Sequence, residues 1–465
     1  MNKLFAKLKT CSKKEVEAFL LFLSQDNSKQ GEVLMALLTA LRKQLKKTSL
    51  DEKKLYQDTF IGKTYNLQLL RVEMSKLNAR LDLFWHYRNI EGKTITTKIN
   101  LLEELSQRKL SQQFDVEYNR AVTQIEKHKS FSEEHLMNQV KLQKTAYEHF
   151  ALLPNREEDQ HLLDLDVATD QLFIFKKLRI ACDMLNRKNI LQKEYSLAFA
   201  QYIIQYIENE QPMLNPLNQT YYCLFNLLKE NNVEAYEQMK ETINRYAADL
   251  GVEEAKEVYA SLQNFCIQQI NKGDANFRTE LFMLYQQLIE SRLIFNGEKI
   301  NVFDYKNIAT IGIQLKEYDW VERFTETYTR NLDKDFQEGA RAFNLARIHF
   351  QKGAYRNALR SLLHVNFPDA YYEMGSRLLI AKIYFEQDEI PLMEAVLSSF
   401  KMYISRNKVI SNTQKEIYLN FIKYALKLCR YVYDSKKLKK LRVDVEQTNN
   451  MVDKEWILDK IKSFY

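Results

Sequence analysis

The chain has 465 residues, of which 45% are hydrophobic, 12% aromatic and 28% charged, and its formal net charge is +7. This balance excludes an intrinsically disordered chain, because so many apolar and aromatic side chains can bury a core. The longest apolar stretch near the N-terminus, residues 18–23, follows Glu15 and Glu17 and is too short for a signal-peptide core. No run of 18 apolar residues occurs. We therefore expect a cytoplasmic protein without membrane contact.

Composition also predicts the secondary structure. Only 10 glycines and 5 prolines interrupt the chain, although average usage of the two together is about 12% of residues. Strong helix formers dominate instead, which predicts an all-α protein. The five cysteines are widely spaced and include no CxxC pair, as expected in a reducing compartment.

Residues 1–92 are predicted to form an N-terminal basic helical module. The pairs Ser12 with Glu15 and Ser49 with Glu52 have the spacing of capping boxes, in which a hydroxyl and a carboxylate satisfy backbone N–H groups of the first helical turn. Gly92 stands where a C-cap glycine would end the module.

A single apolar stripe follows the helix expected at residues 66–85. We expect it to pack against helices at residues 13–24 and 31–47 rather than form a coiled coil, because it is short. The stripe residues recur at steps of four and three: Leu70, Met74, Leu77, Leu81 and Phe84.

The positive charge is concentrated at the start of the chain. Residues 1–100 hold 19 Lys and Arg against 10 Asp and Glu. Such an excess can meet nucleic acid or an acidic protein surface, but scattered lysines on helices usually form a solvated face.

Irregular helical hairpins are predicted for residues 93–211. Polar segments near residues 129–132, 154–156 and 187–189 indicate breaks between long amphipathic helices. Pro212 and Pro216 then mark a boundary, because proline removes a backbone donor and blocks helix continuation.

Residues 212–465 are predicted to form a row of helical hairpins that ends in capping helices. The first hairpin should turn at residues 230–232, and Gly251 and Gly273 stand where helices could end. A repeated pair, Ile308-Ala309, Leu345-Ala346 and Ile380-Ala381, recurs at steps of 37 and 35 residues. Such a period is typical of stacked helical hairpins.

Residues 345–365 resemble the tetratricopeptide repeat family. Leu345, Ala346, Gly353, Tyr355, Ala358 and Leu362 stand at that family's spacing, with His349 where the family prefers tyrosine. In the neighbouring copies Lys316 and Asp388 replace the glycine between the helices, and Val321 and Met393 replace the small alanine. The resemblance implies a TPR-like α-solenoid over residues 212–465. Through segments 65–77 and 306–320, the whole chain also resembles a bacterial family of long helical proteins, which implies no activity.

No catalytic, cofactor or metal site is predicted. The tripeptides at 62–64 and 92–94 resemble the end of a phosphate-binding loop, but Gln57 and Tyr87 stand where the upstream glycine is required. The seven histidines form no HExxH motif, and the acidic residues between 157 and 170 lack the ligand pattern of an EF-hand loop.

The predicted site is a partner-binding surface. In tetratricopeptide-like arrays the first helix of each hairpin lines the concave face, so the resemblance implies a polar, mildly basic floor that can hold an acidic or extended peptide. An alternative is that these positions are ordinary exposed helix residues. The expected floor residues are Lys306, Thr310, Gln314, Asn344, Arg347, Gln351, Lys382 and Glu386.

Two functions remain open on the sequence. The first is a non-enzymatic scaffold or adaptor that binds a protein or peptide along the concave surface of residues 300–400. The second is a regulator linked to DNA or RNA, which would bind through the basic N-terminal module. An enzyme is the least favoured class, because no motif supplies a nucleophile or a general base.

Overall fold

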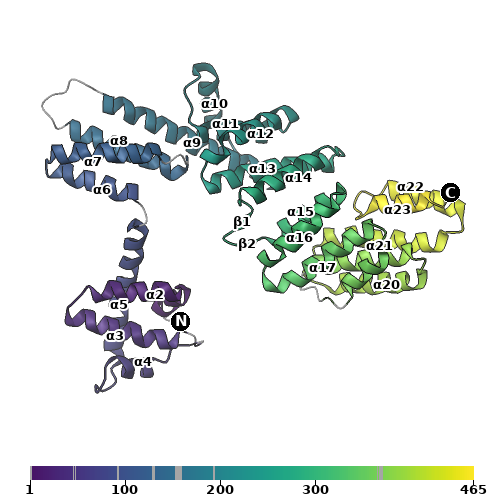
Figure 1. Ribbon diagram of the computed structural model, residues 1–465, viewed down its shortest axis with the longest axis horizontal. Helices are drawn as coiled ribbons and strands as arrows, with labels where there is room; N and C mark the ends of the chain where they lie inside the picture. Colours follow the sequence, from purple (N-terminus) through teal and green to yellow (C-terminus); the bar gives the residue numbers. More distant parts are fainter. Residues whose placement is uncertain are drawn as a thin grey trace. The chain divides into compact units, whose positions relative to one another are not determined.

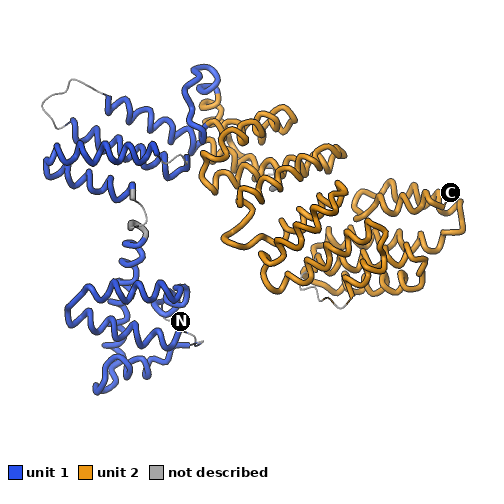
Figure 2. Tube along the Cα trace, viewed as in Figure 1, with its two compact units in different colours: residues 1–177, 205–218 blue, residues 178–204, 219–465 orange. Residues whose placement is uncertain are grey.

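The computed structural model describes residues 3–45, 47, 49–91, 94–127, 131–151, 160–191, 194–363, 365 and 370–464. Over these residues the chain is all-α, as predicted, with 23 α-helices, two short 3-10 helices and one two-stranded hairpin (Figure 1). It divides into two compact units, which are described separately. Unit 1 holds residues 1–177 and 205–218, and unit 2 holds residues 178–204 and 219–465 (Figure 2).

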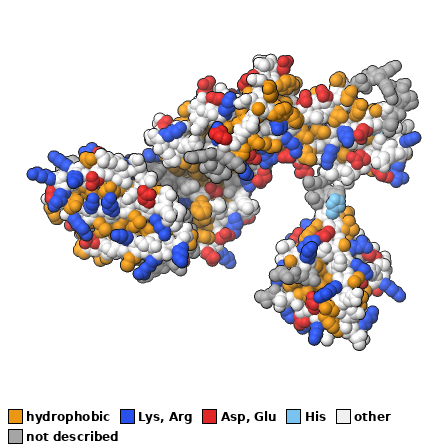
Figure 3. Space-filling view, turned by 180° about the vertical axis from the view of Figure 1, so that it is seen from behind, with side chains coloured by type: hydrophobic (Ala, Val, Ile, Leu, Met, Phe, Trp, Pro, Cys, Tyr) orange, Lys and Arg blue, Asp and Glu red, His pale blue; other side chains and the backbone are white. Residues whose placement is uncertain are grey.

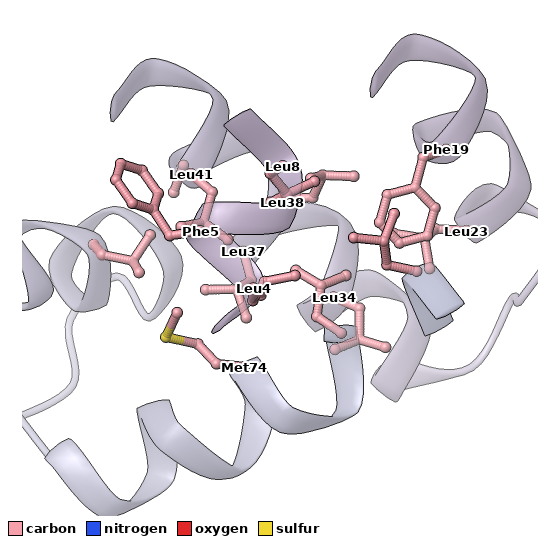
Figure 4. Close-up of a cluster of buried hydrophobic side chains, with 14 of the residues drawn as sticks. Leu4, Phe5, Leu8, Phe19, Leu23, Leu34, Leu37, Leu38, Leu41 and Met74 are labelled. Atoms are coloured by element: carbon pink, nitrogen blue, oxygen red, sulfur yellow. The ribbon is translucent and has the colours of Figure 1, made fainter. Parts of the chain in front are cut away.

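Unit 1 begins with five helices that share one apolar core. The core side chains point toward one another between the helices (Figure 4). The five residues of the predicted stripe all belong to this core, with at most 4% of each residue exposed, so this packing prediction is confirmed. The helices are α1 (Lys3–Thr10), α2 (Lys13–Ser24), α3 (Lys29–Gln44), α4 (Glu52–Thr59) and α5 (Leu67–Glu91).

One of the two predicted capping boxes is present. Ser12 accepts from the Glu15 backbone N–H, and the Glu15 carboxylate accepts from the Ser12 backbone N–H. The prediction at Ser49 was wrong, because α4 is capped by Asp51, which immediately precedes the helix and accepts from the Lys54 backbone N–H. A carboxylate at the N-cap can accept the same backbone hydrogen bond as a serine hydroxyl.

The second part of the chain forms long helices. The predicted break at 129–132 is confirmed at its end, where Ser132 caps α8. The break at 187–189 lies slightly too early, because α9 continues to Leu191. Gly92 and residues 154–156 lie outside the described residues. The helices are α6 (Thr94–Gln107), α7 (Ser111–Lys127), α8 (Glu133–Phe150), α9 (Gln160–Leu191) and α10 (Ala198–Glu210).

Successive helical hairpins make up unit 2 from α11 onward. The predicted turn at 230–232 is confirmed, with Asn232 as the N-cap of α12. The first helices are α11 (Pro216–Glu230), α12 (Val233–Tyr246), η1 (Ala247–Asp249), α13 (Val252–Asn271) and α14 (Phe277–Glu290). A short antiparallel hairpin, β1 (Phe295–Asn296) with β2 (Lys299–Ile300), follows them.

The repeated segment occupies the next helices, and each helix contacts its neighbours in the chain. This pattern of local contacts is compatible with a helical solenoid. The helices are α15 (Val302–Gln314), α16 (Tyr318–Tyr328), η2 (Thr329–Asn331), α17 (Lys334–Gln351), α18 (Tyr355–Leu362), α19 (Ala370–Glu386), α20 (Ile390–Arg406), α21 (Asn412–Tyr431), α22 (Ser435–Glu446) and α23 (Lys454–Lys462).

Three hairpins turn through the same left-handed corner. Gly353 has φ +74°, and the residues that replace glycine in the flanking copies, Lys316 and Asp388, have φ +63° and +61°. After each corner, the next backbone N–H donates to a carbonyl five residues earlier, at distances of 2.8 to 2.9 Å. This is the hydrogen-bond pattern of a Schellman cap.

Two other glycine predictions had different outcomes. Gly273 ends α13 with φ +101°, as predicted. Gly251 does not end a helix but precedes α13 as its N-cap, with φ −63° and ψ 150°. The extended backbone of Gly251 is open to any residue, so it carried no information about a helix end.

Candidate partner-binding face

The first helices of three consecutive hairpins, α15, α17 and α19, lie side by side. The repeated alanines Ala309, Ala346 and Ala381 are fully buried, which lets these helices approach closely. Gly375 on α19 likewise faces the Phe343 ring of α17 so closely that a Cβ would clash with it. The repeat in the sequence therefore marks the contact between neighbouring hairpins.

Arg347 links α17 to α15 on the predicted face. Its Nη1 donates to Thr310 Oγ1 at 2.8 Å, and that hydroxyl donates to the Lys306 carbonyl at 2.7 Å. Burial lowers the pKa of Arg347, and the nearby Asp453 carboxylate opposes this effect. A guanidinium stays protonated under these conditions, so the face keeps a positive charge at this point.

Lys382 on α19 is buried, with 7% of the residue exposed. Its Nζ lies 2.7 Å from Asp453 Oδ2. The ammonium also lies over two aromatic rings, 5.0 Å from the Phe350 centroid and 5.4 Å from the Trp456 centroid. Cation–π contacts and one carboxylate therefore compensate the loss of water around this charge.

The short helix α23 supplies the partners of α19. Trp456 Nε1 donates to Glu386 Oε1 at 3.0 Å, and Lys460 Nζ lies 2.6 Å from Glu386 Oε2. Ile457 and Ile461 of α23 are fully buried in the core of the last helices. A segment of the same chain thus covers the C-terminal part of the predicted face.

The other predicted residues are divided between surface and interior. Gln314 and Gln351 are exposed, and Lys306 is half-buried, with Nζ 5.6 Å from the centroid of the Tyr372 ring. Asn344 is fully buried, and its Nδ2 donates to Thr325 Oγ1 at 3.5 Å. Asn344 therefore lies between helices, where it cannot contact a partner.

Three residues of this site were missed from the sequence: Asp453, Trp456 and Lys460. They lie about two hairpins further along the chain, and nothing in their local pattern indicates a contact with α19. Asp453 has a left-handed backbone, with φ 48° and ψ 39°, at the N-cap of α23. A non-glycine residue in this conformation is a strained position that the surrounding contacts must hold.

Aromatic side chains of the repeated segment contribute to its core. Phe324, Phe350 and Phe385 are buried, while Tyr318 and Trp320 are half-buried against the cluster around Val321. These rings fill the interior between the helices, as large apolar side chains usually do.

The described residues include no group of three or more His, Cys, Asp or Glu side chains placed to hold a metal ion. None of the helices in the described part of the chain has the length and apolarity needed to span a bilayer. No family model, curated protein or solved structure matches this chain. The fold and the site define an all-α protein of consecutive hairpins with a mixed polar and basic face on α15, α17 and α19.

Proposed function

We propose that the protein is a non-enzymatic adaptor or scaffold that binds a partner protein or peptide on the face of α15, α17 and α19. The resemblance of residues 345–365 to the tetratricopeptide repeat family supports this function, because the first helices of that family line a binding surface. The side-by-side packing of α15, α17 and α19 is consistent with it.

The observation that carries the proposal is the pair formed by Lys382 and Asp453. An acidic residue that is distant in sequence is held on this face by an ammonium and two aromatic rings. The same groups would attract an acidic residue of a partner, since charge-assisted hydrogen bonds to carboxylates are the strong ones. The partner would therefore be a protein with an acidic, extended or helical segment.

The exposed portion of the face lies on α15 and α17. Gln314 and Gln351 remain accessible there, whereas Glu386 is engaged by α23. We place first contact with the partner at these two glutamines, next to the half-buried Arg347. Engagement of Lys382 would require a carboxylate that replaces Asp453.

The experiment is capture of partners from an extract of the native cell with the full chain as bait, followed by mass spectrometry. The double variant Arg347→Glu/Lys382→Glu should lose a partner that the wild type retains. Lys401→Glu/Arg406→Glu, which reverses two exposed charges on α20, is the matched control.

A second double variant separates binding from folding. Gln314→Ala/Gln351→Ala changes only exposed side chains, so the fold should survive and retention should still fall. Unchanged retention of every partner by both double variants would reject this face as the binding site.

The excess of Lys and Arg in residues 1–100 supports nucleic-acid binding as a second candidate function. Against it, several cations of the N-terminal module are already paired within the module, and charged side chains of both signs are interspersed on the face drawn in Figure 3. The ion pairs are Lys7 with Asp82, Arg42 with Glu17, Lys76 with Glu73, Arg80 with Asp26 and Arg88 with Glu15. A gel shift of the full chain at two salt concentrations tests this alternative, since phosphate binding weakens steeply with salt. Absence of a shift at low salt would eliminate it.

A further inference from the structure

Unit 1 contains a cavity of about 920 Å³ between α7, α8, α9 and the segment 212–216, here called the α7–α9 cavity. Its volume falls within the range of about 300–1,000 Å³ that is usual for small-molecule sites. Much of its wall is apolar, including Val122, Ile125, Leu142, Val167, Ile174 and Met213.

One amide side chain fixes the mouth of this cavity. Gln171 Nε2 donates to the Met213 carbonyl at 3.0 Å, and Gln171 Oε1 accepts from the Asn215 backbone N–H and from Asn215 Nδ2 at 3.2 and 2.8 Å. Asn218 Nδ2 donates to the same oxygen at 2.8 Å. The segment between the two prolines is therefore held against α9, and the mouth is formed before any ligand arrives.

The charges of the wall have one sign. Glu126, Asp164 and Asp170 line the cavity, whereas no Lys, Arg or His is among the described residues that line it. Burial, together with the nearby Asp164 carboxylate, raises the pKa of the Tyr118 phenol. The negative field of Asp164 thus acts on the wall of the cavity itself.

Aromatic rings add a second attraction for a cation. Tyr118, Phe131 and Tyr206 line the cavity together with the carboxylates. The face of an aromatic ring attracts an ammonium or guanidinium group, and more strongly where water is excluded. Carboxylates, ring faces and apolar walls therefore favour a ligand that combines positive charge with hydrocarbon.

We propose that the α7–α9 cavity binds a small organic cation with an aliphatic body, of the class of the aliphatic diamines. Asp164 and Asp170 are six residues apart on α9, which corresponds to about 9 Å along the helix axis. One ammonium pairs with each of these carboxylates, and the methylene chain lies against Val167, which stands between them on α9. This site is independent of the partner-binding face in unit 2.

The test is titration calorimetry of the full chain with 1,8-diaminooctane at low salt. The neutral 1,8-octanediol has the same length and serves as the control ligand. The diamine should bind at one site per chain. Its affinity should decrease as salt is added, since salt screens the attraction between its ammonium groups and the carboxylates. The diol should not bind detectably. A diol that binds as tightly as the diamine would overturn the proposal, and so would a diamine that does not bind the wild type.

Variants on one helix provide matched controls. Asp164→Asn/Asp170→Asn should weaken diamine binding at least about tenfold, since each lost charge-assisted contact corresponds to roughly that factor. Asp166→Asn changes an exposed residue of α9 that does not line the cavity and should bind like the wild type. Equal losses in both variants would indicate nonspecific attraction and reject the site.

A further variant does not depend on the carboxylates. Val167 is 59% exposed at the wall, so Val167→Lys should fold normally while it places a cation in the cavity. It should abolish diamine binding, with thermal unfolding unchanged. Retained binding in this variant would place the diamine elsewhere on the chain.

Discussion

Lys382 and Asp453 form an ion pair of 2.7 Å although they are 71 positions apart in the chain. The pair joins α19 to the N-terminus of α23. The lysine side chain is 9% exposed and the aspartate side chain 37% exposed, so the two charges differ in their access to water. Removal of one partner should therefore not be equivalent to removal of the other.

Asp453→Asn should lower the free energy of unfolding by about 2 kcal/mol, because it leaves a buried ammonium without its carboxylate. Lys382→Met should cost less than about 1 kcal/mol, because the remaining carboxylate can be hydrated. Urea denaturation of the two single variants and of the double variant measures the coupling. Equal losses of unfolding free energy in the two single variants would contradict the conclusion that Lys382 is the more deeply buried charge of the pair.

The left-handed corners predict a stabilising substitution. Lys316→Gly should raise the free energy of unfolding by about 0.5 kcal/mol, since the strain of a side chain at positive φ exceeds the entropy cost of glycine there. Asp388→Gly should gain less, because aspartate tolerates this conformation better. Gly353→Ala should lose about 1 kcal/mol. Thermal unfolding measures the stability change of each of the three variants. A loss of stability in Lys316→Gly would contradict the prediction that the lysine side chain is strained at this corner.

The close approach of α15 and α16 predicts a destabilising substitution. A Cβ at Gly312 would clash with Val321 Cγ2, and the Phe282 ring would lie 3.3 Å away. Gly312→Ala should therefore cost about 1–3 kcal/mol, as overpacking of a core usually does. Gly312→Ala/Val321→Ala should recover part of the loss by making room for the new methyl group. If the single variant were as stable as the wild type, the two helices could not pack as described.

His149 predicts a pH dependence of stability. The residue is buried, its ring stacks on Phe114 with 3.8 Å between centroids, and its Nδ1 lies 3.0 Å from Ser106 Oγ. Desolvation lowers its pKa below 6.5, and Asp115 only partly opposes the shift. Between the folded pKa and 6.5 the unfolded chain binds more protons, so stability falls as the pH decreases through this window.

His149→Phe keeps the aromatic stack and removes the titrating group. Denaturation of the full chain at pH 7.5 and 5.5 should show a smaller decrease in stability for this variant than for the wild type. An NMR titration should also place the imidazole pKa of the wild-type residue below 6.5. An imidazole pKa above 6.5 would reverse the expected sign.

Much of the fold could be predicted from the sequence because its determinants are local. The scarcity of glycine and proline, the Ser12 capping box and the apolar stripe ending at Phe84 all act within a few turns of one helix. The repeated alanines predicted the stacking of the hairpins for the same reason, since each lies at a contact with the adjacent hairpin. The Asp51 cap was missed because two polar residues competed for one helix start.

The candidate site was harder to predict because its partners are distant in sequence. Thr310 and Arg347 stand at equivalent positions of adjacent repeats, so the repeat period assigned both to one face, but the hydrogen bond between them was not predicted. Asp453 and Trp456 follow no such period, and their contacts with Lys382 and Glu386 depend on how the last helices fold back. The burial of Asn344 was missed because asparagine is usually exposed, whereas here Thr325 accepts its amide hydrogen.

The attachment of α23 to α19 has a mechanical consequence. When the two ends of a repeat protein are pulled, hairpins that contact only adjacent hairpins can unfold one at a time. The contacts of Asp453, Trp456 and Lys460 extend past the intervening helices and fasten α19 to the last helix. Under load, the segment from α19 to α23 would therefore resist as one block, while the hairpins before it yield in succession.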